Sequence, residues 1–106
     1  MSDGDQVVLT VRAGDWAETW RVADMTDALL TAYFEDATGG RLRAKTVAVW
    51  VAVMRAFQEA GIPQTVRQVF YKLTTFGALP KTEQGYKKAA YHLLTMRRAG
   101  VLPYWW

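Results

Sequence analysis

The sequence contains no cysteine and a single histidine, His92. Without thiols there can be no disulfide framework and no thiolate metal site, and one imidazole cannot form a histidine cluster. We therefore expect no metal site and no cofactor in this chain. We interpret His92 as a surface or boundary residue.

Long apolar runs are also missing, since the best of them, residues 47–54, is far too short to span a bilayer. The sequence starts Met-Ser-Asp-Gly-Asp, which is acidic where a secretory signal would be basic. These features predict a soluble, cytoplasmic protein with no membrane partner.

Acidic residues are scarce in the C-terminal part. Eight of the ten acids precede residue 40, and only Glu59 and Glu83 follow it. The formal net charge is +3, a mild excess that suits an anionic partner. The 106 residues suffice for one compact core, and Gly39-Gly40 is the best candidate for a joint. We divide the chain into an acidic segment, 1–40, and a basic segment, 41–106.

Hydrophobic residues in the acidic segment recur with two different spacings. Residues 6–12 and 16–22 alternate in hydrophobicity on either side of a short turn with glycine, which predicts a β-hairpin. From Met25 the apolar spacing becomes helical. Thr26 or Asp24 can cap this helix, and Gly39-Gly40 ends it.

The basic segment predicts three helices. The first, 42–60, is the most apolar and should be the central helix. The second, 65–76, begins after a threonine N-cap, and the third, 82–98, follows a short apolar stretch. Residues 101–106 would form a wing strand. The order is that of a winged helix-turn-helix, so the predicted fold class is α+β, mostly helical, with a winged helix-turn-helix preceded by a β-hairpin and a helix.

Helical projections assign a face to each side chain of the last two helices. In helix 65–76 the inward residues are Val66, Val69, Phe70, Leu73 and Phe76. Tyr71 lies nearly opposite and should be exposed, with Arg67 one turn before it. In helix 82–98 the inward residues are Tyr86, Ala89, Ala90, Leu93 and Met96, and the outward stripe is Gln84, Lys88, Tyr91, Thr95 and Arg98. Arg97 falls on the apolar side, which favours a structural role over a DNA contact.

The outward stripe mixes cations, hydrogen-bonding groups and an aromatic ring, as contacts with phosphates and groove edges require. A charged stripe by itself is more often a solvated face, but the order of the helices favours DNA. The predicted DNA-binding residues are Arg67, Tyr71, Lys81, Gln84, Lys87, Lys88, Tyr91, Thr95 and Arg98.

Three segments, 65–73, 81–86 and 97–103, together resemble the winged-helix domain of topoisomerase VI A-subunit-like proteins, including forms carried by phages and plasmids. That family carries an Arg-x-aliphatic-aromatic-Tyr motif, and Arg67, Val69, Phe70 and Tyr71 match it position by position. The resemblance implies that Tyr71 is the candidate nucleophile for a DNA phosphodiester and that Arg67 contacts phosphate. A guanidinium one turn away would favour the reactive phenolate.

Cleavage in this family also uses a magnesium-binding Toprim domain on the same polypeptide, and nothing in the chain matches that domain. We therefore predict a non-catalytic protein that binds duplex DNA. One alternative is the DNA-cleaving part of a topoisomerase VI-like enzyme, completed by a separate subunit. Another is a phage-type interaction module or inhibitor that binds a protein partner or forms a homodimer, since the five Trp and five Tyr could anchor a protein interface.

Overall fold

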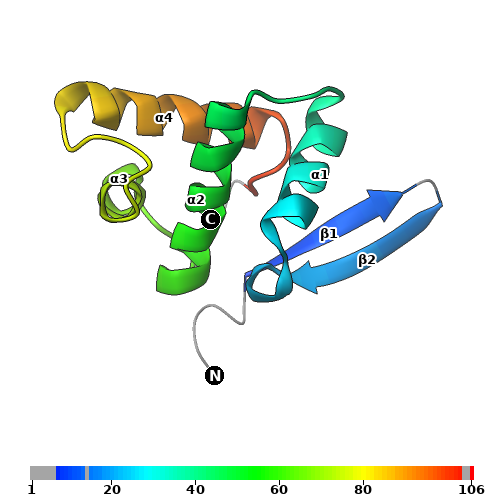
Figure 1. Ribbon diagram of the computed structural model, residues 1–106. Helices are drawn as coiled ribbons and strands as arrows, with labels where there is room; N and C mark the ends of the chain where they lie inside the picture. The colour runs from blue at the N-terminus through cyan, green and yellow to red at the C-terminus, as the bar shows by residue number, and fades with distance from the viewer. Residues whose placement is uncertain (1–6, 14, 104–105) are drawn as a thin grey trace.

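The computed structural model describes residues 7–13, 15–103 and 106 (Figure 1). In this part of the chain a two-stranded antiparallel hairpin precedes four α-helices, so the α+β, mostly helical prediction is confirmed. Strand β1 (Val8–Ala13) pairs with β2 (Trp16–Arg21), with Leu9 opposite Trp20. The predicted turn includes Gly14, which lies outside the described residues.

The hairpin is anchored at one end only. Val7 and Leu9 are buried, and the backbone N–H of Val22 donates to the Val7 carbonyl at 2.9 Å. A short 3-10 turn, η2 (Val22–Asp24), then leads to the first helix. Figure 1 shows the other end of the hairpin projecting away from the helices.

Helix α1 (Asp27–Thr38) begins and ends where its sequence predicts. The Thr26 hydroxyl accepts a hydrogen bond from the Leu29 N–H, and Gly39 adopts the left-handed conformation at φ 75°. Leu30 and Phe34 are buried on its inner side.

Helix α2 (Ala44–Ala60) is the central helix, as predicted (Figure 1). Its Trp50, Met54 and Phe57 side chains are buried, and the Phe34 ring meets Trp50 edge-on at 5.4 Å. One hydrophobic core therefore includes residues from both segments, 1–40 and 41–106.

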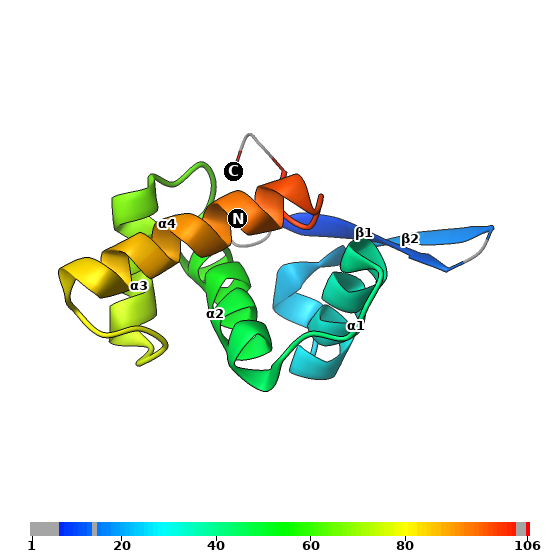
Figure 2. The same cartoon turned by 90° about the horizontal axis from the view of Figure 1, so that it is seen from above.

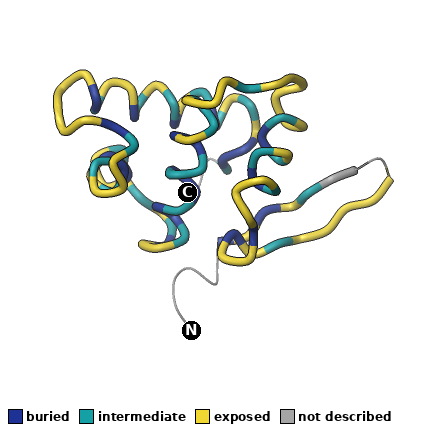
Figure 3. The backbone as a smooth tube through the Cα atoms, in the orientation of Figure 1, coloured by how far each residue is buried: buried dark blue, intermediate teal, exposed yellow. Residues whose placement is uncertain are grey.

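Helices α3 (Val66–Thr75) and α4 (Glu83–Arg98) follow predicted start signals. Thr65 and Gln68 form a reciprocal capping box on α3, and Thr82 caps α4. Figure 2 shows α4 crossing over α3 and α2, and Figure 3 shows that its outer side is exposed along most of its length.

The inward faces predicted for α3 and α4 are correct in their main members, which are Val69, Phe70, Leu73, Ala89, Leu93 and Met96. Phe76 is an exception, since 39% of it is exposed. It is the C-cap residue of α3, with φ −75° and ψ −8°, so it keeps the direction of the helical period but lies beyond Thr75, the last residue of the helix. It lies in a shallow surface hollow beside Val51 and Arg55.

A wing strand is not seen in residues 101–103 and 106, the described part of the C-terminal segment. The N–H groups of Val101 and Leu102 both bond to the Met96 carbonyl, which closes the end of α4 and leaves them unavailable for a strand ladder. Trp106 packs on Phe57, and Arg97 donates to the Trp106 backbone oxygen at 3.2 Å. The winged-helix assignment stays a prediction, with Tyr104 and Trp105 outside the described residues.

Among the described helices, none is both long enough and apolar enough to cross a membrane.

Candidate nucleic-acid interface

The predicted DNA-binding residues lie on α3, on α4 and in the loop between them. All of them except Thr95 are exposed. Thr95 is half-buried, and its hydroxyl donates to the Tyr91 carbonyl at 2.9 Å, so its proton is already used. Lys87 makes a loose ion pair with Glu83 at 3.8 Å. Both partners are largely exposed, so this pair contributes little and leaves Lys87 available for a phosphate.

The centre of the exposed face of α4 is apolar. Tyr91 is 65% exposed and Leu94 is 45% exposed, and they stand one turn apart. The outward stripe predicted from the sequence includes Tyr91 but omits Leu94, although the same helical projection places Leu94 only about 20° from Lys87. A rim of cations around two apolar side chains can contact phosphates at its edges and base edges at its centre.

Arg67 is held by two tyrosines. Its guanidinium carbon lies 5.3 Å from the centroid of the Tyr86 ring, and that ring meets Phe70 edge-on at 5.5 Å. Hydrogen bonding to Tyr71 is the main cause that raises the pKa of Arg67, and electrostatic interaction with Tyr71 and Tyr86 adds to it. The predicted neighbours Arg67 and Tyr71 therefore lie close enough to interact, and Tyr86, which the sequence predicted only as a core residue, is a positioning residue.

The Arg67–Tyr71 pair lines a surface hollow of about 360 Å³, which we call the α3–α4 hollow. Its lining consists of Arg67, Phe70, Tyr71, Lys81, Thr82, Glu83 and Tyr86. The structure thus brings Lys81 to the same place as Arg67 and Tyr71. A hollow with two cations and an exposed phenol can receive a phosphate group.

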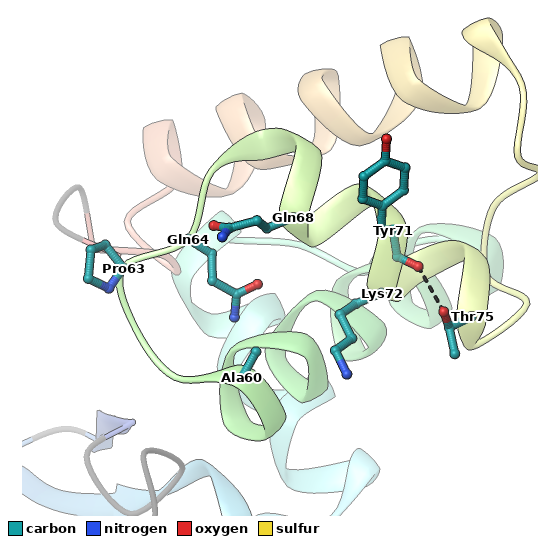
Figure 4. Close-up of a pocket in the computed structure, with 7 residues that line it drawn as sticks. All are labelled: Ala60, Pro63, Gln64, Gln68, Tyr71, Lys72 and Thr75. Carbon is teal, nitrogen blue, oxygen red and sulfur yellow. Dashed lines mark hydrogen bonds between the residues drawn. The ribbon is translucent and has the colours of Figure 1, made fainter.

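A second hollow lies on the other side of Tyr71 (Figure 4). Lys72, which also lines it, pairs with Glu59 at 2.8 Å, and Figure 4 shows its ammonium pointing away from the Tyr71 hydroxyl. The Gln64 amide donates to the carbonyls of Ala56 and Gly61. Arg67, rather than the adjacent Lys72, is therefore the cation beside the Tyr71 side chain.

A larger hollow, of about 750 Å³, lies between the start of α2, the α3–α4 loop and α4; we call it the α2–α4 hollow. It brings the predicted residues Lys88 and Tyr91 next to Arg43 and Lys45. Neither Arg43 nor Lys45 is among the residues predicted from the sequence. The sequence did contain a signal for them. Cations at the N-terminus of a helix interact unfavourably with the helix dipole, so their presence there indicates a role other than stabilising the helix.

His92 also lines this hollow and is half-buried, in keeping with its interpretation as a boundary residue. Its Nδ1 accepts a hydrogen bond from the Trp50 indole at 3.1 Å. Burial lowers the pKa of His92 below its ordinary value, and the charge of Lys88 lowers it further. The imidazole is therefore neutral at physiological pH and serves as an acceptor.

Carboxylates, histidines and cysteines do not gather in groups of three or more anywhere in the described parts of the chain. Comparison of the sequence and the structure with protein-family models, curated proteins and solved structures found no match. Only the chain's own residues therefore indicate its function.

Proposed function

We propose that this chain binds duplex DNA, without cleaving it, through the exposed face of α4 and the Arg67–Tyr71 pair of α3. The observation that carries the proposal is that this surface combines cations that have no described ion-pair partner with exposed apolar side chains. Lys88 and Arg98 stand on it with no ion-pair partner among the described residues, and Tyr91 and Leu94 project between the cations. Unpaired cations around exposed apolar groups match a partner that offers phosphates and base edges together.

The size of α4 agrees with this partner. An α-helix with its side chains is roughly 10–12 Å wide, and the major groove of B-DNA is about 12 Å wide. In such a position Leu94 and the Tyr91 ring could contact thymine methyl groups, and Gln84 could pair with an adenine edge. Lys87, Lys88 and Arg98 would then lie close to the backbones.

Arg67 and Tyr71 would add a phosphate contact at a small cost in side-chain conformational entropy. The Arg67 guanidinium already rests on the Tyr86 ring and interacts electrostatically with Tyr71, so less side-chain entropy is lost when it binds an oxyanion. A cytoplasmic location is part of the same proposal, because DNA lies in the cytoplasm of cells that have no nucleus.

The test is a salt-dependent titration of a fluorescent duplex of about 20 base pairs, followed by anisotropy. The double variant Lys88→Ala, Arg98→Ala should bind more weakly. Its slope of log K against log salt should be shallower by about one unit for each phosphate that the variant no longer neutralises. Binding that is unchanged in the double variant would reject the α4 face as the interface.

DNA cleavage is the second candidate function, because Tyr71 is exposed at 47% and lines one hollow with Arg67, in the motif that resembles a catalytic tyrosine. A detergent-resistant covalent adduct between the chain and DNA would distinguish cleavage from binding alone.

A further inference from the structure

The α2–α4 hollow is lined by positive charges and by no negative charge. Arg43, Lys45 and Lys88 line it, and no carboxylate does. None of these cations makes an ion pair with another residue in the described part of the chain. Elsewhere in the chain, Arg55 in the second half of α2 pairs with Asp27, and Lys72 on α3 pairs with Glu59. Three cations with no described ion-pair partner thus lie around one hollow between the start of α2 and α4.

The N-terminus of α2 also differs from those of the other α-helices in how it is capped. Thr26, Thr65 and Thr82 cap α1, α3 and α4 with their side chains, whereas Arg43, the N-cap residue of α2, makes no side-chain capping bond. Cations at a helix N-terminus cost stability, because they add to the positive end of the helix dipole. This departure, together with the unpaired cations of the hollow, suits a site for an anion.

The two cationic hollows lie on opposite flanks of α4. With about 100° between successive residues, Tyr86 lies roughly 120° to one side of the centre of the exposed face, and His92 roughly 120° to the other. Tyr86 lines the α3–α4 hollow with Arg67, and His92 lines the α2–α4 hollow with Arg43. Cations therefore flank both edges of the α4 face.

A duplex offers the matching arrangement, because two phosphate backbones border each major groove. We propose that the α2–α4 hollow binds a backbone phosphate of one DNA strand while the α3–α4 hollow contacts the other strand, with α4 in the groove between them. This inference rests on the proposed function and adds to the interface Arg43 and Lys45, which belong to neither α3 nor α4.

The first arm of the test measures duplex binding by anisotropy over a range of salt concentrations. Arg43→Gln and Lys45→Gln should each make the slope of log K against log salt shallower by about one unit. Each should also weaken binding roughly tenfold at about 0.1 M salt. The matched control is Arg21→Gln, which removes one cation from the end of β2 and should leave the slope unchanged. Melting followed by circular dichroism should show both α2 variants at least as stable as the parent, because each removes a cation from a helix start.

The second arm uses inorganic phosphate alone and follows backbone amide shifts by NMR. Shifts at residues 44–46 that disappear in Arg43→Gln support the hollow as a phosphate site. If the duplex binds but both α2 variants behave like Arg21→Gln, the inference is wrong and the proposed function stands. If phosphate shifts these amides but no duplex binds, the proposed function fails, and the two-strand arrangement fails with it.

Discussion

The indole N–H of Trp50 on α2 donates a hydrogen bond to Nδ1 of His92 on α4, across 42 positions in the sequence and 3.1 Å in space. The bond joins the central helix to the proposed DNA-contacting helix just beneath the α2–α4 hollow. An Nδ1 that carries a proton cannot accept it. Protonation of His92 therefore breaks a contact between the two helices.

Stability should fall as His92 gains a proton. Burial, and to a smaller extent Lys88, lowers the pKa of His92 in the folded chain below its ordinary value of 6.5. The unfolded chain thus takes up the proton at a higher pH than the folded one. The contribution of neutral His92 is complete above about pH 6.5 and is lost as the pH falls through that value toward the folded pKa.

The measurement compares urea midpoints at about pH 7.5 and about pH 5.5, a window above most carboxylate titrations. We expect a lower midpoint at the acid end. His92→Gln should remove most of that difference, because an amide oxygen can accept from the indole and does not titrate. An equal pH difference in the variant would assign the effect to other groups.

Arg55 links the two segments of the chain. Its guanidinium donates to the carbonyls of Val22 and Met25 at 3.0 and 2.7 Å and also contacts Asp27. Arg55→Met keeps the apolar stem but leaves the Met25 carbonyl without this partner. We expect a loss of about 2–3 kcal/mol in the free energy of unfolding, measured by urea denaturation. Lys87→Met, which removes only the exposed pair with Glu83, should cost less than about 1 kcal/mol.

Gly85 should not tolerate a side chain. It is buried in the first turn of α4, and a Cβ atom there would collide with the Pro80 carbonyl oxygen and lie 3.4 Å from the Phe70 ring. Because the colliding atom belongs to the backbone, relief requires movement of the α3–α4 loop. Gly85→Ala should lower the free energy of unfolding by about 1–3 kcal/mol.

The matched control for this substitution is Gly40→Ala, because a Cβ atom there meets nothing within 4 Å. That variant should change stability by less than about 1 kcal/mol in either direction. Thermal melts of the two variants side by side check the prediction, and equal melting temperatures would contradict it.

Tyr71 should contribute to DNA affinity without reacting. Tyr71→Phe removes one hydroxyl and should cost about 1 kcal/mol of binding free energy, the usual net worth of a hydrogen bond. Arg67→Ala should cost more, because it removes a cation that two tyrosines hold in place. Tyr91→Phe is the comparison, because it keeps the ring that would enter the groove and removes the hydroxyl of an exposed tyrosine away from Arg67. Anisotropy titrations at fixed salt measure all three.

A covalent assay tests whether Tyr71 reacts. The purified chain is incubated with supercoiled DNA and magnesium, and detergent-resistant protein–DNA adducts are sought. We expect none. An adduct that forms with the parent chain and disappears in Tyr71→Phe, but not in Tyr91→Phe, would replace the non-catalytic proposal with a transesterase.

The limits of the helices could be predicted from the sequence because their signals are local. Thr65 and Gln68 satisfy each other's backbone groups within one turn, and Gly39 and Gly77 provide left-handed conformations that few other residues adopt. The exposure of Tyr71 and the burial of Leu93 follow from the period of a helix already located. The fold class and most of the α3 and α4 faces belong to this category.

Local patterns in the chain thus specify the elements and their faces, whereas the way those faces meet depends on tertiary packing. Arg43 and Lys45 come next to Lys88 only because α4 packs across α2, and this arrangement depends on the packing of Trp50, Leu93 and the rest of one shared core. Phe76 fits the helical period and is still partly exposed, because the helix ends there. Local rules act over one or two turns, whereas the candidate site joins residues whose proximity the whole core fixes.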